Sequence, residues 1–263
     1  MSMTSAPADR DRLAAAFTHP GVADAYRHRP PYPAEVFDVL ERLIADRPAA
    51  VLDLGAGEGA LARPLAGRVD HVDAVDISAA MVETGRRRPG GRRPNLRWIV
   101  APAQTAVLGG PYALVTAGAS LHWMPWRPTL ARVARAMNGR AVLAIVDQGH
   151  HDLPWRGELN EVIARHSRSP GYDPGFSLPD ALAAAGLLQI TGRATTTPTA
   201  FRQPVAAYVE QFHSTASLAR EWMPPEEAAA FSREIAGVVA PYACGGMLGM
   251  DVVAELAWGR VTA

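Results

Sequence analysis

The chain has no lysine, only one cysteine and no long apolar run. The single cysteine, Cys244, excludes a disulfide within the chain, which suits a reducing cytosol and predicts a cytoplasmic protein. A transmembrane helix needs about 18 consecutive apolar residues, and the sequence contains no such stretch. The N-terminal residues also lack the apolar core of a secretory signal peptide, so we expect none.

The chain also has no formal net charge, because 26 basic residues are balanced by 26 acidic ones. A neutral chain gives no general attraction to nucleic acid or to an anionic membrane, and we expect neither as a partner. The arginines nevertheless gather in residues 86–93. We interpret this run as a solvated loop between a helix and a strand, and the alternative is a patch that binds an anion or RNA.

Cysteine and histidine clusters with metal-ligand spacing are also missing from the sequence. His150 and His151 stand beside Asp152 at the end of an apolar run. This pattern favours a polar loop over a metal site, and we predict no bound metal.

From residue 49 onward, short apolar runs alternate with stretches of helical periodicity. The alternation predicts an α/β fold with a mostly parallel sheet, right-handed crossovers and helices on both faces. Asn138 and Gly139 are expected to end the third helix of this region. The first five strands are predicted at 49–54, 71–76, 95–100, 111–117 and 140–146. The helices between them are predicted at 59–66, 78–87 and 128–137.

The flanking regions complete the predicted fold. Two further strands, at 187–197 and 246–261, bring the sheet to seven. Residues 1–34 are expected to form an N-terminal lid or clasp, 35–147 the ligand-binding core, and 148–263 the rest of the sheet with helical insertions over the substrate. We expect these three segments to form a single domain overall. The remaining helices are predicted at 34–46, 155–166, 178–185, 204–218 and 224–240.

The strongest feature is a buried strand that runs into a glycine-rich turn, whose residues allow a tight turn and the close approach of a ligand. Asp53, at the end of that strand, would repel a pyrophosphate but suits a cationic ligand such as an amino-acid ammonium. Asp76 ends the next strand, where an acid can accept hydrogen bonds from ribose hydroxyls. The structural alternatives are that Asp53 holds the turn and Asp76 caps the helix after it. The turn reads Asp53-Leu54-Gly55-Ala56-Gly57-Glu58-Gly59.

This turn, followed by Val75-Asp76-Ile77-Ser78 and Met81, resembles the class I S-adenosylmethionine (SAM)-dependent methyltransferases. The similarity is to the methyltransferase type 11 branch around trans-aconitate methyltransferase. It implies a Rossmann-like fold with a helical lid, SAM as cofactor and S-adenosylhomocysteine as product. The glycine loop would pack under the amino-acid part of SAM, and Asp76 would hold the ribose. The implied cofactor-binding residues are Tyr26, Arg29, Asp53, Gly55, Ala56, Gly57, Asp76, Ile77, Met81, Ala103, Gln104, Ala117 and Gly118.

Two further segments resemble the same branch. His122-Trp123 follows the fourth strand, where the branch has a pair that helps to wall the acceptor pocket. His122 would act as a general base or, as we favour, would either have a structural role, capping the next helix or packing on Trp123, or only position the substrate. Trp123 would line the pocket or pack in the core. The run Tyr26 to Pro33 resembles a signature of the branch, which implies that Tyr26 reaches the SAM carboxylate and that Arg29 pairs with that carboxylate or with an acidic acceptor. A proline-fixed clasp is the alternative. Trp155 and Tyr172 are expected to contact the substrate, although such aromatics also fill cores.

These features predict an enzyme that methylates a small molecule. Carboxylate O-methylation leads, because of the His122-Trp123 pair and Arg29, and amine N-, phenol O- and carbon methylation stay open. A carboxylate acceptor needs no base, so positioning would supply most of the acceleration. A nicotinamide-dependent oxidoreductase is disfavoured by the glycine spacing, by Asp53 and by the absence of a Tyr-x-x-x-Lys pair. An RNA or protein methyltransferase and an inactive SAM-binding module are the remaining alternatives.

Overall fold

A computed structural model describes residues 13–169 and 175–262, and the chain forms two compact units. The sheet unit consists of Tyr32–Gly149, Ser177–Thr197 and Val253–Ala263. The helical unit consists of Met1–Pro31, His150–Phe176 and Pro198–Val252. Residues 148–263 therefore contribute to both units.

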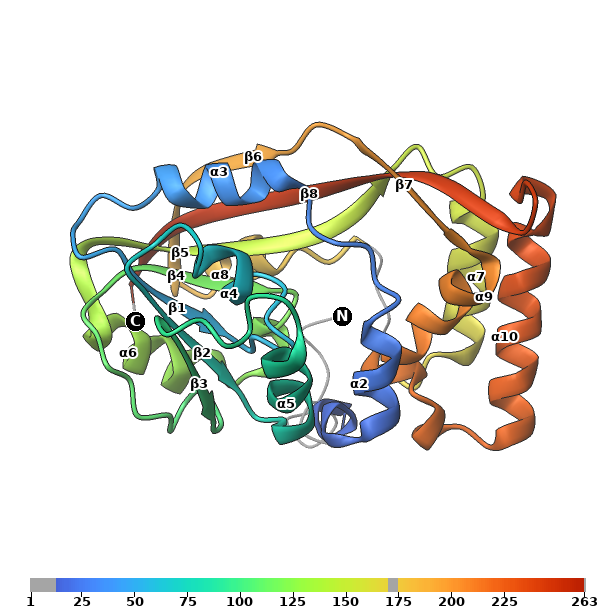
Figure 1. Cartoon of the computed structure of the whole chain (residues 1–263), viewed down its shortest axis with the longest axis horizontal. Coiled ribbons are helices and arrows are strands. Elements are labelled where there is room, and N and C mark those ends of the chain that lie inside the picture. The colour runs from blue at the N-terminus through green and yellow to red at the C-terminus, as the bar shows by residue number, and fades with distance from the viewer. Residues whose placement is uncertain (1–12, 170–174, 263) are drawn as a thin grey trace. The chain divides into compact units, whose positions relative to one another are not determined.

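An eight-stranded sheet runs in the order β3-β2-β1-β4-β5-β8-β6, with β7 paired to β8 (Figure 1). The first five strands pair in parallel: β1 (Ala50–Leu54), β2 (His71–Asp76), β3 (Leu96–Val100), β4 (Tyr112–Gly118) and β5 (Met137–His151). Two others pair antiparallel with β8 (Met247–Val261), namely β6 (Leu188–Thr195) and β7 (Thr199–Pro204). The predicted Rossmann-like α/β class is confirmed.

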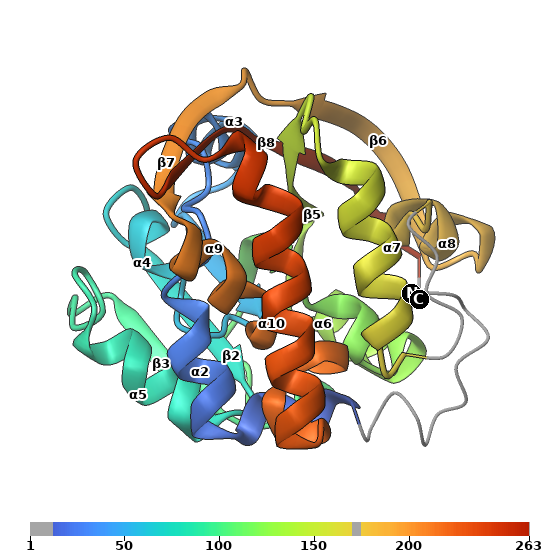
Figure 2. The ribbon, with the colours of Figure 1, turned by 90° about the vertical axis from the view of Figure 1, so that its right-hand side faces the viewer.

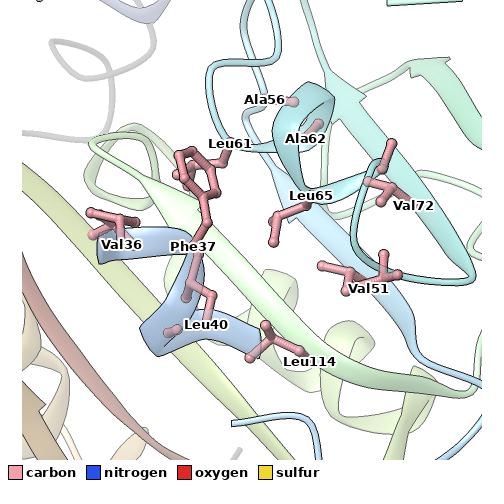
Figure 3. Close-up of a cluster of buried hydrophobic side chains, with 14 of the residues drawn as sticks. Val36, Phe37, Leu40, Val51, Ala56, Leu61, Ala62, Leu65, Val72 and Leu114 are labelled. Carbon is pink, nitrogen blue, oxygen red and sulfur yellow. The ribbon is translucent and has the colours of Figure 1, made fainter. Parts of the chain in front are cut away.

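Helices cover both faces of the sheet in the sheet unit. Figure 3 shows one of these packings, in which Phe37 and Leu65 belong to the same buried cluster as Val51 and Leu114 of the strands, and the Phe37 ring lies beside Leu61. Burial of these apolar side chains stabilises the unit by removing them from water. The helices are α3 (Ala34–Arg42), α4 (Ala62–Leu65), α5 (Ala79–Arg87), the 3-10 turn η2 (Leu121–Trp123), α6 (Trp126–Ala136) and α8 (Leu178–Ala184).

Two predicted helix ends in the sheet unit are wrong. The helix expected at 59–66 begins only at Ala62, because Gly59 has a φ of 79°, which no right-handed helix accommodates. Asn138 and Gly139 do not cap a helix. Instead α6 ends at Ala136 and β5 begins at Met137, which pairs with Tyr112 of β4. Pairing within the sheet has overridden the local turn signal.

The helical unit packs α7 (Arg156–His166) against α10 (Pro225–Val239), as Figure 2 shows. Glu234 joins the two helices, since it accepts from Arg165 at 2.6 Å and lies 3.1 Å from the ring nitrogen of His166. The smaller elements of the helical unit are η1 (Ala15–Thr18), α2 (Pro20–Tyr26), α9 (Val205–Glu210), η3 (Gln211–Ser214), η4 (Ala216–Leu218), η5 (Arg220–Trp222) and η6 (Ala240–Tyr242). None of the helices in the described ranges has the length and apolarity needed to cross a membrane.

The single helix predicted at 204–218 is also wrong, because the chain breaks into α9, η3 and η4 there. Ser214 Oγ donates to the Gln211 carbonyl at 2.5 Å, and His213 Nδ1 lies 2.9 Å from the Leu218 carbonyl. Side chains that bond to nearby backbone groups compete with the helical pattern. Strand β7 was not predicted, since its sequence lacks an apolar alternation.

Candidate active site

The glycine loop follows β1 at the edge of the sheet where the parallel strands end. Gly55 has a φ of 63° and Gly57 a φ of 56°, which residues with a side chain adopt only at a cost in free energy. A Cβ atom at Gly55 would lie 2.6 Å from the Cβ of Ser120, so the close packing of this loop also requires glycine. The register of the strands brings the ends of β1, β2 and β3 to the same edge.

Asp76 ties the glycine loop to the end of β2. Its Oδ2 accepts from the backbone N–H of Gly57 at 2.7 Å, and its Oδ1 accepts from the N–H of Ser78 at 2.7 Å. Burial raises the pKa of this carboxyl, and the two backbone hydrogen bonds oppose the rise. Ser78 in turn caps α5, because its Oγ accepts from Met81 N at 3.2 Å. The carboxylate thus holds the loop, and each oxygen retains capacity to accept a further hydrogen bond.

Asp53 is 1% exposed and faces β4. Thr116 Oγ1 donates to its Oδ1 at 2.8 Å. Burial raises the pKa of Asp53 to about 7, although the hydrogen bonds from Thr116 and the Ala62 backbone lower it. A buried carboxyl at this pKa responds strongly to a nearby cation, which would stabilise its ionised form.

Two apolar side chains are exposed beside Asp76. Ile77 is 51% exposed and Val100, at the end of β3, is 50% exposed. Val100 pairs with Asp76 in the register of β2 and β3, so both apolar groups lie at the edge that carries the glycine loop. Exposed apolar residues of this size at a ligand edge offer a flat surface to an aromatic ring. Val100 is not among the site residues predicted from the sequence, and the signal that could have indicated it is an apolar residue at the last position of a strand.

The segment after β4 closes the other side of the loop. Ser120 Oγ donates to the Leu54 carbonyl at 2.5 Å, which links this segment to the end of β1. A Cβ at Gly118 would lie 2.8 Å from the Tyr32 hydroxyl oxygen, so the glycine serves packing within the sheet unit. His122 and Trp123 lie in η2 with ring centroids 4.7 Å apart. Their predicted roles toward an acceptor stay predictions.

The remaining predicted residues of the sheet unit differ in exposure. Ala56, Met81, Ala103 and Ala117 are buried, and Gln104 is partly exposed. Ala56 donates its N–H to the Val75 carbonyl at 2.9 Å, so it helps to join the loop to β2. Contacts of these five residues with a cofactor stay predictions.

Tyr26, Arg29 and Trp155 belong to the helical unit. Arg29 Nε donates to Ser214 Oγ at 2.7 Å, and its guanidinium lies 4.3 Å from the centre of the Tyr26 ring. Trp155 is 2% exposed and donates to the Tyr208 hydroxyl at 2.8 Å, as a core residue does. Tyr172 lies outside the described residues. Roles of these four in binding stay predictions.

Comparison with known proteins finds a match to part of the chain. Residues 51–139 match the family model described as a methyltransferase domain. A trans-aconitate 2-methyltransferase from Mycobacterium sp. (strain KMS) is 33% identical over 141 residues, which are 51% of this chain and 52% of that protein. The chain thus spans about half the length of the curated relatives that it matches.

Solved structures show the same fold. A proposed type II methyltransferase from Anaeromyxobacter dehalogenans superimposes with a TM-score of 0.61 and 20% identity, over 88% of this chain and 97% of that one. A SAM-dependent methyltransferase from Thiobacillus denitrificans, solved with S-adenosyl-L-homocysteine, has a TM-score of 0.51 and 16% identity, over 89% and 96% of the two chains. Residues 51–139, which contain the glycine loop and Asp76, therefore match a methyltransferase domain, and the solved structures share its fold.

Proposed function

We propose that this chain transfers the methyl group of SAM to a small molecule, and that the acceptor atom is a carboxylate oxygen. The observation that carries the methyltransferase part is the loop at Gly55 and Gly57, held by Asp76 beside the exposed Ile77 and Val100. The loop and the buried Asp53 suit a ligand with an ammonium group. The exposed apolar pair suits an aromatic base, and Asp76 between them suits a ribose.

SAM, when bound, supplies an electrophilic methyl group on a sulfonium sulfur. An oxygen of the acceptor carboxylate forms the new C–O bond while the C–S bond breaks and the electron pair leaves with sulfur. The products are a methyl ester and S-adenosylhomocysteine, and no proton has to be removed. The task of the protein is then to align the acceptor with the methyl group, which supplies most of the acceleration in such a displacement.

The carboxylate preference rests on two supports. Curated relatives that are 33% identical over about half their length are named trans-aconitate 2-methyltransferases, and aconitate is a carboxylic acid. His122 and Trp123 follow β4 at the ligand edge, in the place that resembles the acceptor wall of that branch. A neutral or protonated imidazole can hold a carboxylate by donating a hydrogen bond, so His122 acts here by positioning rather than as a base.

The test has two parts. Calorimetry with S-adenosylhomocysteine should give micromolar binding that Asp76→Ala abolishes, with NAD as the control that does not bind. Turnover should then be followed as S-adenosylhomocysteine release with carboxylic acids, phenols and amines as acceptors. Methyl ester formation on an acid supports the proposal. Turnover on phenols or amines alone would contradict the proposed carboxylate acceptor. Tight NAD binding without S-adenosylhomocysteine binding would overturn the proposal that the chain is a methyltransferase.

His122→Ala and His122→Gln separate positioning from proton transfer. Because a positioning residue mainly affects how the acceptor is held, we expect a KM for the acid at least about tenfold higher in His122→Ala and partial recovery in His122→Gln. The affinity for S-adenosylhomocysteine should stay unchanged in both variants. A wild-type kcat that changes with pH as an imidazole titrates, together with a loss of kcat and of this pH dependence in His122→Ala, would show instead that His122 is a base.

A further inference from the structure

Five arginines of the sheet unit line an open, shallow hollow of about 670 Å³ at the turn between α5 and β3. Its lining consists of Arg86, Arg87, Arg88, Gly90, Arg92 and Arg93. The chain as a whole has no net charge, so this concentration of positive charge is local.

The turn that carries these arginines is held by specific contacts. The indole N–H of Trp98 donates to the Gly91 carbonyl at 2.9 Å, and Arg63 donates to the Pro89 carbonyl at 2.9 Å. Gly91 packs so closely that a Cβ there would lie 1.9 Å from the Gly85 carbonyl oxygen. A fixed backbone lowers the entropy lost when a ligand orders the side chains above it.

Among the residues that the structure describes, two of the five guanidinium groups have an acidic partner. Arg87 pairs with Glu83 at 2.8 Å, and Arg88 pairs with Glu58 at 2.7 Å. Within the described residues no carboxylate lies within ion-pair distance of the other three, Arg86, Arg92 and Arg93. Like charges that line the same hollow repel one another, so an anion that enters it relieves that repulsion as well as forming new contacts.

We propose that this hollow binds a compact polyanion that carries two or more phosphate groups. A guanidinium binds phosphate through two parallel hydrogen bonds, which makes arginine the residue suited to phosphate recognition. A single carboxylate or sulfate cannot neutralise three unpaired guanidiniums. The charge is gathered in one hollow rather than along a stripe, which favours a diphosphate or triphosphate over the extended backbone of a nucleic acid.

The experiment titrates the full chain with inorganic tripolyphosphate by calorimetry in a zwitterionic buffer at low salt, with sulfate alongside. The test variant is Arg86→Gln, Arg92→Gln and Arg93→Gln combined. The matched control combines Arg42→Gln, Arg135→Gln and Arg260→Gln, three exposed arginines elsewhere in the sheet unit. Binding of S-adenosylhomocysteine and thermal unfolding are measured for each protein, so that a loss of fold is detected separately.

We expect tripolyphosphate to bind more tightly than sulfate, and the test variant to weaken its binding by about tenfold or more while the control stays within about twofold. Glu83→Gln releases Arg87, so this substitution should strengthen binding by about two- to threefold. Equal losses in both triple variants, or binding that does not distinguish tripolyphosphate from sulfate, would overturn the proposal. Binding of an RNA oligomer without binding of tripolyphosphate would also overturn it and assign the patch to nucleic acid.

Discussion

The buried carboxyl of Asp53 affects both the stability of the protein and the binding of a cationic ligand. Its pKa is raised to about 7, chiefly by burial, from an ordinary value of 3.8. Between these two pH values the folded protein binds more protons at this site than the unfolded chain does. The contribution of Asp53 to stability therefore falls as the pH rises from about 4 to about 7, and stays level above that.

Asp53→Asn should stabilise the ligand-free protein at pH 8, because it removes the cost of burying a carboxylate. We expect a gain of about 1–2 kcal/mol, since each pKa unit corresponds to about 1.4 kcal/mol and the amide is imperfectly satisfied. No gain is expected at pH 4. Urea unfolding at both pH values measures the effect, and Asp38→Asn, which is exposed, serves as the control. A loss of stability at pH 8 would contradict the prediction.

The affinity of the wild-type protein for S-adenosylhomocysteine should depend on pH through the same residue. An ammonium group on the ligand favours the ionised form of Asp53, so binding should tighten as the pH rises from 6 to 8. The slope is at most about tenfold per pH unit below the pKa. Asp53→Asn should bind more weakly and lose this dependence. A wild-type affinity that is flat across this range would show that Asp53 does not face the ammonium.

Three strands are joined at the opposite end of the sheet by Asp73, which is fully buried on β2. It accepts from Arg97 of β3 at 2.6 and 2.7 Å, from the Tyr112 hydroxyl of β4, and lies 2.7 Å from His71 Nε2. Burial raises the pKa of Asp73, but these hydrogen bonds outweigh it and lower the pKa below 3.8. The pKa of Tyr112 is raised to about 12 by burial and by this carboxylate.

Asp73→Asn should destabilise the protein by about 2–3 kcal/mol, because it leaves buried partners of a charged network unsatisfied. Arg97 is about half exposed, at 47%, which keeps the loss below that of a fully buried pair. Because the pKa is lowered in the folded state, this contribution is present above about pH 4 and is lost as the pH falls below it. Chemical denaturation at pH 7 and pH 3 gives the measurement. Equal effects of Asp73→Asn and the exposed Asp38→Asn would contradict it.

Trp155 lies in the core of the helical unit, so its substitution can show whether this side chain only packs there or also binds the substrate. Its ring lies 5.0 Å from the Tyr242 ring, and its indole donates to Tyr208. Trp155→Ala should cost about 3–5 kcal/mol of stability, and Tyr208→Phe about 1 kcal/mol through the lost hydrogen bond. If Trp155 only packs, Trp155→Phe should keep the KM for the acceptor. A raised KM without a loss of stability would assign Trp155 to the substrate.

At the scale of the whole molecule, binding of the cofactor to the sheet unit should raise the free energy of unfolding. S-adenosylhomocysteine at 100 times its Kd should add about 2.7 kcal/mol to the free energy of unfolding. Hydrogen exchange should slow around residues 55–59 and 75–81, where the loop and β2 meet, and Asp76→Ala should abolish both effects. Protection confined to the helical unit would place the cofactor elsewhere.

Local patterns in the sequence were enough for the central part of the molecule. Parallel strands buried on both faces appear as short apolar runs, and a glycine turn with positive φ values requires glycine whatever surrounds it. The positions of Gly55, Asp53 and Asp76 at one edge follow from strand ends that any parallel sheet brings together. The fold of this region and the position of the candidate site were therefore predictable from residues 51–81, whereas the methyltransferase class was implied by the resemblance of these residues to a known family.

Other features depend on contacts between residues far apart in the sequence, and only the tertiary structure decided them. Met137 joined β5 because Tyr112 pairs with it, against the turn signal of the next two residues. The helix expected at 204–218 was broken by side chains that found closer backbone partners. The exposed Val100 and the hollow of arginines arise from the way strands and turns meet in space. Local sequence encodes turns, caps and strand ends, whereas pairing and packing choose among them.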